Sequence, residues 1–325
     1  MSTLVIETER LVKRYGNKTA VADLTLQVPR GEVFGFLGPN GSGKSTSVKM
    51  LLGLVRPCSG SARILGQAPG HPPTMARVGF LPEHFRFHEW LQAGELLDLH
   101  GRLSGMDAAT RRRRIPELLE LVRLSEHARR PLSGFSKGML QRIGLAQALL
   151  NHPDLVFLDE PTSALDPFGR MLVRNIIRDL KQQGTTIFLN SHLLGEVEAT
   201  CDRVSFIREG RVLRTLVLSD FHAERLTVEV CVDSASPELL AALEELAGSG
   251  VARVPPAPTP FASTPFHPPS ANVTRLELTL RDEALLPSIA EQVLARGSRL
   301  YALVPRPTSL EQLFLEVVGT EDSGQ

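Results

Sequence analysis

Strand-like and helix-like segments alternate over the first two-thirds of the chain. Some of the apolar runs are short and nearly free of polar residues, which is typical of strands buried in a parallel sheet. The predicted strands are Leu24–Val28, Val33–Leu37, Leu155–Leu158 and Thr185–Leu189, and the predicted helices include Gly138–Asn151 and Phe168–Gln183. This alternation predicts an α/β fold.

A mostly helical, more charged stretch interrupts this pattern between about residues 84 and 135. We interpret it as a helical subdomain inserted into the α/β fold. The α/β pattern ends near Leu218. The sequence therefore predicts a first domain over residues 1–218 and a second, accessory domain over residues 219–325.

The second domain shows strand, helix and strand patterns twice in succession. The first set is Leu226–Val232, Pro237–Ala247 and Val251–Val254, and the second is Val273–Leu280, Pro287–Ala295 and Leu300–Val304. This order predicts a small α+β sandwich of the ferredoxin-like kind. A proline-dense loop, Pro255–Ser270, separates the two sets, and a last amphipathic helix is expected over Ser309–Val318.

Composition narrows the classes of function. The 325 residues include 36 Lys and Arg and 36 Asp and Glu, so the formal net charge is zero. A dedicated nucleic-acid-binding protein would usually carry a basic surplus, so we expect none here. Three widely spaced cysteines suggest neither disulfides nor a zinc site, and no apolar run approaches the ~20 residues of a membrane span. We expect a soluble, cytoplasmic protein that reaches a membrane only through a partner.

A glycine-rich phosphate-binding motif follows the predicted strand Val33–Leu37 and precedes a predicted helix. Its residues are Gly38, Pro39, Asn40, Gly41, Ser42, Gly43, Lys44, Ser45 and Thr46. Glycines let successive backbone N–H groups point at phosphate oxygens, and the helix N-terminus adds partial positive charge. We expect Lys44 to reach the β- and γ-phosphates and the Ser45 hydroxyl to bind Mg²⁺.

Two carboxylates, Asp159 and Glu160, end the apolar run Leu155–Leu158. In P-loop ATPases such an aspartate helps to hold Mg²⁺, and the neighbouring glutamate can orient and polarise the attacking water. The motif and this pair together predict a site for ATP and Mg²⁺.

With these residues the chain resembles an ATP-binding-cassette (ABC) ATPase of the P-loop NTPase class. Further family elements follow in the family's order: Tyr15 before the P-loop, Glu83 at the Q-loop, Ser136 and Gly138 in the signature, Asp166 in the next loop and His192 after the following strand. The resemblance covers about Leu4 to Leu218. It implies that Tyr15 stacks on adenine, that Ser136 and Gly138 contact the γ-phosphate held by an opposite cassette, and that His192 contacts the γ-phosphate.

Because the chain has one P-loop and one signature, the resemblance implies a second cassette, most simply in a homodimer. Two departures from the family pattern stand out. The signature reads Phe-Ser-Lys-Gly-Met at residues 135–139 where the family has Leu-Ser-Gly-Gly-Gln. Glu83 replaces the usual glutamine, where it can still bind Mg²⁺ or its water but adds negative charge beside the γ-phosphate.

Both departures, and the ending Ser309-Leu310-Glu311 followed by Phe314, resemble the branch of cytosolic ATPases that pair with separately encoded permeases, often exporters. We therefore expect an ATPase on the cytoplasmic face of the cell membrane, bound to an integral membrane permease. Trp90 lies where the family receives the permease, although packing inside the helical subdomain is an equal alternative.

Three alternative functions are weighed against this one. A soluble ABC ATPase acting on ribosomes or DNA would usually carry two cassettes or a long coiled coil, and neither is visible. A different P-loop enzyme, such as a kinase or GTPase, would lack the signature and His192. The second domain could act as a binding or dimerisation module that regulates the ATPase.

Overall fold

The computed structural model of this chain describes residues 3–224, 226–247, 252–254, 273–280, 283–307 and 309–319. The predicted proline-rich loop, Pro255–Ser270, lies outside these residues. Residue contacts divide the chain into two compact units. Unit 1 runs to Val217 and includes residues from Phe314 on, and unit 2 runs from Leu218 to Leu313.

Unit 1 is built on a nine-stranded sheet with the order β4-β1-β2-β9-β8-β3-β7-β6-β5. Strands β8, β3, β7, β6 and β5 are parallel to their neighbours in this part of the sheet. Their bounds are β3 Val33–Leu37, β5 Val78–Leu81, β6 Leu155–Asp159, β7 Thr186–Asn190 and β8 Arg203–Arg208. Every residue of β3, β6 and β7 is buried, as expected for strands covered on both faces.

The other half of the sheet is antiparallel at β4-β1-β2 and was not fully predicted from the sequence. Its strands are β1 Leu4–Tyr15, β2 Lys18–Pro29, β4 Ser59–Ile64 and β9 Arg211–Val217. The register between β1 and β2 shifts at several points, for example between Thr8 and Leu11. Each shift breaks the apolar alternation that marks a strand, so β1 is hard to recognise in the sequence.

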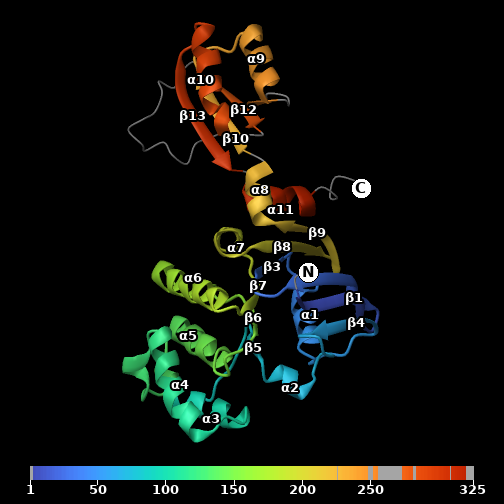
Figure 1. Cartoon of the computed structure of the whole chain (residues 1–325), viewed down its shortest axis with the longest axis vertical. Helices are drawn as coiled ribbons and strands as arrows, with labels where there is room; N and C mark the ends of the chain where they lie inside the picture. Colours follow the sequence, from blue (N-terminus) through green and yellow to red (C-terminus); the bar gives the residue numbers. More distant parts are fainter. Residues whose placement is uncertain are drawn as a thin grey trace. The chain divides into compact units, whose positions relative to one another are not determined.

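The helices of unit 1 lie around this sheet (Figure 1). They are α1 Lys44–Leu51, α2 Pro72–Met75, α3 Ala93–Leu103, α4 Ala108–Leu121, α5 Lys137–Ala148, α6 Pro167–Gln182 and α7 Leu194–Thr200. Helices α3 and α4 lie within residues 84–135, where the sequence predicts a helical subdomain, and Arg111 of α4 donates to Asp98 of α3 at 2.7 Å. Side chains of α1 pack both against β1 and β4 and against the central strands.

Four phenylalanines from three neighbouring strands form the centre of the core of unit 1. The ring of Phe188 on β7 lies 5.6 Å from Phe34, 5.2 Å from Phe36 and 5.2 Å from Phe157 between centroids. All four rings are almost fully buried. Because β3, β6 and β7 also end at the predicted site, this cluster holds the strands that position it.

Unit 2 contains a four-stranded antiparallel sheet with the order β11-β12-β10-β13. Its elements are α8 Leu218–Glu224, β10 Leu226–Val232, α9 Pro237–Ala247, β11 Ala252–Val254, β12 Thr274–Leu280, α10 Leu286–Ala295 and β13 Leu300–Pro307. The strands of the two β-α-β sets interleave: β12 of the second set lies between β11 and β10 of the first, and β13 lies at the edge beside β10. This order is typical of ferredoxin-like sandwiches. One cluster of buried aliphatic side chains joins the sheet to α9 and α10.

The last helix, α11 Leu310–Gly319, ends in unit 1 rather than in unit 2. The ring of Phe314 lies 6.1 Å from the ring of Phe206, a buried residue of β8. The described residues 314–319, which the sequence placed in the accessory domain, therefore group with the first unit.

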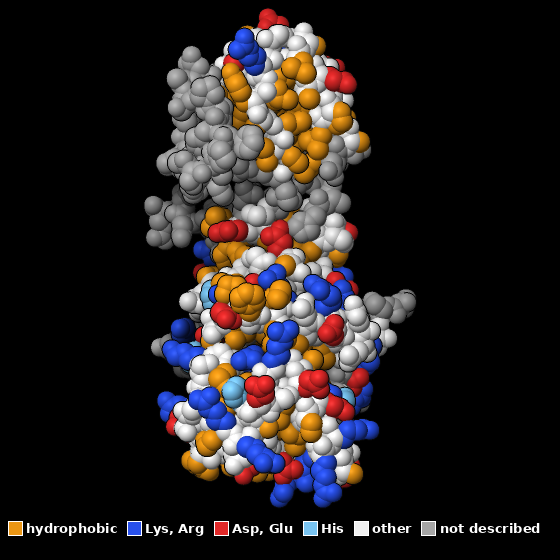
Figure 2. All heavy atoms as spheres, turned by 90° about the vertical axis from the view of Figure 1, so that its left-hand side faces the viewer, with side chains coloured by type: hydrophobic (Ala, Val, Ile, Leu, Met, Phe, Trp, Pro, Cys, Tyr) orange, Lys and Arg blue, Asp and Glu red, His pale blue; other side chains and the backbone are white. Residues whose placement is uncertain are grey.

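The surface of unit 1 carries both signs of charge. On the face drawn in Figure 2, Lys and Arg side chains lie among Asp and Glu side chains over the elements of unit 1. Among the described residues, no helix is both long enough and apolar enough to cross a membrane.

We predict that Phe188→Ala lowers the free energy of unfolding of unit 1 by about 3–5 kcal/mol, because it leaves a cavity at the centre of three rings. Phe168→Ala is the matched control, since this side chain is 76% exposed, and it should change stability by less than about 0.5 kcal/mol. Urea unfolding of the full chain measures both. Equal losses in the two variants would contradict the assigned core.

Candidate functional site

The glycine-rich loop connects β3 to α1, as the sequence predicts. Gly41 and Gly43 have φ angles of 82° and 102°, which side-chain-bearing residues rarely adopt. A Cβ atom on Gly38 would lie 2.2 Å from the carbonyl oxygen of Ile207. The loop can therefore take this path only with glycine at these positions.

Lys44, the first residue of α1, turns its side chain back over the loop. Its Nζ donates to the carbonyl oxygens of Gly38 at 2.7 Å and Pro39 at 3.0 Å. Burial lowers the pKa of Lys44, and the nearby carboxylates of Glu160, Asp159 and Glu83 oppose that shift. An anionic ligand bound here would compete with these two carbonyl oxygens for the ammonium group of Lys44.

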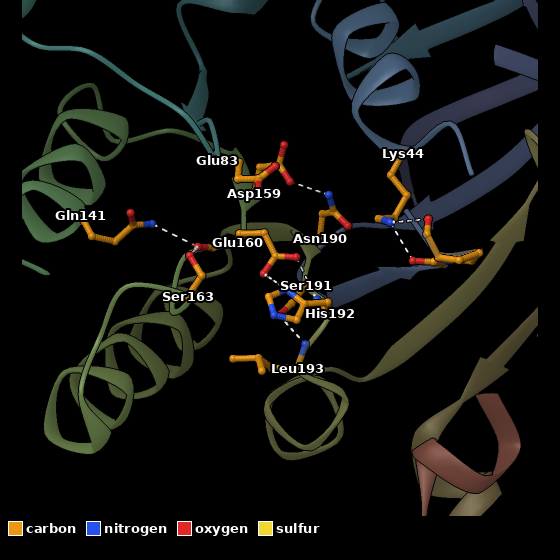
Figure 3. Close-up of polar contacts among 12 residues, drawn as sticks. Lys44, Glu83, Gln141, Asp159, Glu160, Ser163, Asn190, Ser191, His192 and Leu193 are labelled. Atoms are coloured by element: carbon orange, nitrogen blue, oxygen red, sulfur yellow. Dashed lines mark hydrogen bonds and ion pairs between the residues drawn. The ribbon is translucent and has the colours of Figure 1, made fainter. Parts of the chain in front are cut away.

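Asp159 ends β6 and lies opposite Asn190, which ends β7 in parallel register. The Asn190 Nδ2 group donates to the Asp159 carboxylate (Figure 3). Burial raises the pKa of Asp159; the bond from Asn190 opposes the shift, while Glu83 and Glu160 add to it. The carboxylate thus lies in an environment that favours a nearby positive charge.

Glu160 has a left-handed backbone, with φ of 52°, which is strained for a residue with a side chain. Its amide donates to the Asn190 carbonyl at 2.8 Å. Its own carbonyl accepts from Gln141 Nε2 at 3.2 Å and from Ser163 Oγ at 3.1 Å. These bonds hold the turn after β6 in the conformation that directs the Glu160 carboxylate toward His192 (Figure 3).

His192 contacts both oxygens of the Glu160 carboxylate. Its backbone amide donates to Oε1 at 2.9 Å, and its ring Nδ1 lies 2.8 Å from Oε2. The Glu160 side chain is 8% exposed, whereas the His192 side chain is 61% exposed. A buried carboxylate with an imidazole at its open side is suited to orient and deprotonate water.

These groups surround one cavity of about 430 Å³. Its lining residues are Lys18, Ala20, Asn40, Gly41, Gly43, Lys44, Ser45, Thr46, Glu83, Glu160, Asn190 and His192. Tyr15 is not among them, but its partner across the β1–β2 hairpin, Lys18, is. Tyr15 is 50% exposed, and the Nζ of Lys13 lies over its ring, 5.1 Å from the ring centre.

The donor set of this cavity fits a magnesium-bound polyphosphate. Ser42 Oγ is buried and has no hydrogen-bond partner among the described residues. The loop glycines have no side chains that would keep a bound group away from the backbone N–H groups. The Ser45 hydroxyl, Asp159 and Glu83 offer the oxygen ligands that Mg²⁺ prefers when phosphates supply the remainder.

The signature residues lie in a different cavity, of about 500 Å³. Ser136 caps α5, because its Oγ accepts a hydrogen bond from the Met139 amide at 3.2 Å. This cap supports the assignment of the signature to residues 135–139. Asp166 caps α6 by accepting from the Gly169 amide at 2.7 Å. Ser136, Gly138 and Asp166 all line this cavity, and none of them lines the P-loop cavity.

The sequence did not single out Asn190, Gln141 or Lys18 as functional residues. Asn190 stands directly before the motif residues Ser191 and His192 at the end of a buried strand, so its position was a usable signal. Gln141 bonds the Glu160 backbone only because α5 packs beside β6, which no local pattern reveals. Lys18 reaches the cavity only through the β1–β2 hairpin.

The profile of the ABC transporter family matches residues 21–163, which include the P-loop, Asp159 and Glu160. An ABC transporter ATP-binding protein of Bacillus subtilis is 33% identical over 314 residues, which cover 97% of this chain and 99% of that protein. The chain belongs to the ABC transporter family. Its ATP-binding part is the segment that carries the site described above.

Two further relatives show how far the similarity extends. An ABC transporter ATP-binding protein of Nostoc sp. is 45% identical over 218 residues, which are 66% of this chain but only 65% of that protein. The match thus spans slightly less than two-thirds of its length. A Nod factor export ATP-binding protein of Paraburkholderia xenovorans is 39% identical over 249 residues, 76% of this chain and 82% of that protein.

Solved structures agree with the fold of unit 1. One, an ATP-binding subunit of an ABC transporter, has a TM-score of 0.63 and 32% identity, with 68% of this chain and 92% of that chain covered. Another is a dimeric ATP-binding cassette in a post-hydrolysis state with ADP and Pi. It has a TM-score of 0.61 and 25% identity over 66% of this chain and 98% of that chain.

We predict that Asp159→Asn has opposite effects on stability and activity. Because burial raises the pKa of Asp159, the folded state favours its neutral form, so keeping it ionised at pH 7 reduces stability. The neutral amide should raise the melting temperature of the nucleotide-free protein while Mg-ATP turnover falls at least about 100-fold.

The control for that variant is Asp179→Asn, which neutralises an exposed carboxylate on α6 and should change neither quantity. Melting curves without nucleotide and steady-state phosphate release measure the two effects. An Asp159→Asn protein that melts below the wild type at pH 7 would contradict the electrostatic description of this site.

Proposed function

We propose that this chain is the ATP-binding and ATP-hydrolysing subunit of an ABC transporter that moves a substrate, in the export direction, through a separate membrane permease. The observation that carries this proposal is the cavity in which Lys44, Ser45, Glu160 and His192 converge, with Asp159 bonded to the lining residue Asn190. The relative named for Nod factor export supports the direction. The location that follows is the cytoplasmic face of the membrane.

In this proposal each residue of the P-loop cavity has one task. The loop amides and Lys44 bind the β- and γ-phosphates, and the ring of Tyr15 stacks on the adenine. Ser45 and Asp159 hold Mg²⁺, with Glu83 binding the ion or its water. When bound, the ion neutralises charge on the phosphates.

Glu160 orients the attacking water and accepts its proton, since its carboxylate is buried and fixed by the His192 amide. His192 is exposed enough to contact the γ-phosphate while its Nδ1 remains beside Glu160. The left-handed turn at Glu160 keeps this carboxylate rigid, so little reorganisation accompanies the reaction.

A second copy of the chain completes the site. Ser136 and Gly138 line a cavity separate from the P-loop cavity, so within one chain they do not reach the nucleotide. The N-terminus of α5 and the Ser136 hydroxyl form an anion site that suits a γ-phosphate presented by another chain. The dimeric cassette among the similar structures supports a homodimer.

The surface that follows Glu83 is the proposed contact with the permease. Trp90 is 74% exposed, and its ring lies 4.8 Å from the His88 ring, so the alternative of core packing is wrong. Phe85 and Phe87 stack on one another at 4.8 Å. These aromatic residues line a cavity of about 660 Å³, a size that accepts a partner helix or loop.

We propose that unit 1 forms the ATPase and that unit 2, from Leu218 to Leu313, is an accessory domain. The alignment with the Bacillus subtilis relative runs through this region as well. The mixed charges on the face drawn in Figure 2 do not favour the alternative of a soluble ATPase acting on ribosomes or DNA, nor does any other observation.

We predict that Glu160→Gln binds ATP with near wild-type affinity but hydrolyses it at least about 100-fold more slowly, because the amide cannot accept the proton of water. Equilibrium binding of a fluorescent ATP analogue and phosphate release measure the two steps. Glu198→Gln, on α7, is the matched control and should leave both unchanged. Near-normal turnover by Glu160→Gln would remove Glu160 from this role.

We predict that Trp90→Ala removes most of the multi-span membrane protein that co-purifies with the tagged full chain in mild detergent, because a buried aromatic anchor contributes about 2 kcal/mol or more. Leu103→Ala, which changes an exposed apolar residue elsewhere on the same subdomain, should retain the partner. Mass spectrometry of the co-purified proteins measures how much of the membrane protein each variant retains. Equal recovery from both variants would place the permease on another surface.

A further inference from the structure

The P-loop cavity and the signature cavity of unit 1 differ in charge. The P-loop cavity contains the carboxylates of Glu83 and Glu160, with Asp159 beside them, against Lys44 and Lys18. The signature cavity contains three cations, Arg123, Lys137 and Arg142, against Asp166. A bound Mg-ATP adds further negative charge to the first cavity, so the second is electrostatically complementary to it.

Among the cations of the signature cavity, Lys137 is the one that follows Ser136 directly in the sequence, and it is exposed. Arg142 is engaged with the chain itself, since its Nη1 donates to the carbonyl oxygens of Val122 at 2.9 Å and Arg123 at 3.1 Å. Within the described part of the chain, Lys137 makes no ion pair. Its ammonium group is therefore available to an external anion.

Lys137 also occupies a position that is unfavourable for the helix itself. It is the first residue of α5, where the helix dipole favours acidic side chains over cations. Helix α3, by contrast, carries Glu95 in its first turn, as the dipole prefers. Lys137 therefore opposes the charge preference of its own helix beside a proposed anion site. Such a conflict indicates that the residue serves a function.

Glu83 supplies that reason on the other side of the nucleotide. Its side chain is 47% exposed and lines the same cavity as Lys44 and Ser45. Figure 3 shows Glu83 next to Asp159. Together with Asp159 and Glu160, it is the third carboxylate near the proposed position of the phosphates. With glutamine at position 83, the cavity would hold one negative charge fewer.

We propose that Lys137 of one copy lies against the terminal phosphate bound by the second copy and offsets the additional negative charge of that copy's Glu83. This inference rests on the homodimer proposed above and assigns Lys137 a positioning role in its closure. The two departures from the family pattern, at residues 83 and 137, are then one compensated change. Each dimer contains two such pairs, because the interface is symmetric.

The test is a double-mutant cycle on dimerisation of the full chain. Sedimentation is measured with Mg²⁺ and the non-hydrolysable β,γ-imido analogue of ATP, for the wild type, Lys137→Gln, Glu83→Gln and the double variant. Lys137→Arg keeps the charge, and Arg112→Gln removes an equivalent exposed charge from α4. The readout is the analogue concentration at which half of the chain is dimeric.

We expect Lys137→Gln to raise that concentration about tenfold in the wild-type background but less than about threefold when Glu83 is already glutamine. Lys137→Arg and Arg112→Gln should stay close to the wild type. The increase in that concentration caused by Lys137→Gln should be smaller in 1 M salt, since salt screens the charges that Lys137 offsets.

Two outcomes would overturn the pairing while leaving the homodimer intact. One is a Lys137→Gln variant that behaves like Arg112→Gln, and the other is an equal loss in both Glu83 backgrounds. A wild-type chain that stays monomeric with saturating analogue, although it binds the analogue, would instead overturn the homodimer and this inference together.

Discussion

The parallel register between β6 and β7 is the constraint on which the rest of the site depends. It places Asp159 opposite Asn190, and the register of β3 with β7 places Phe36 opposite the same asparagine. The P-loop that follows β3 and the carboxylates that follow β6 therefore meet at one edge of the sheet. The buried rings around Phe188 hold the three strands in this register, so the packing of the core fixes the geometry of the charges.

This arrangement is electrostatically costly without a ligand. Burial raises the pKa of Asp159 and lowers the pKa of Lys44, so each charge depends on the others nearby. The backbone of Glu160 is strained as well, and bonds from Gln141 and Ser163 hold it in place. Strain and shifted pKa values of this kind cluster at functional sites.

Much of the fold could be predicted from the sequence, because buried parallel strands are short apolar runs and the P-loop has a fixed spacing. The strand Val33–Leu37 agrees with the structure at both ends. The strand β1 was missed because its register shifts break the alternation of apolar residues. The return of Phe314 to Phe206 was also beyond a local pattern, since it joins residues more than a hundred positions apart. In the P-loop cavity, Lys44, Ser45 and His192 belong to motifs that the sequence reveals, whereas Lys18 reaches the cavity, and Gln141 reaches the Glu160 backbone, only through packing in the folded chain.

The separation of the signature cavity from the P-loop cavity leads to the central claim, that two copies of the chain share each nucleotide. The most direct test is the rate of ATP turnover per chain as a function of the concentration of the chain. A site shared between two copies predicts that this rate rises with concentration and then levels off as dimers form. A rate per chain that stays constant down to dilutions at which the protein is monomeric would contradict the claim and show that one chain is sufficient.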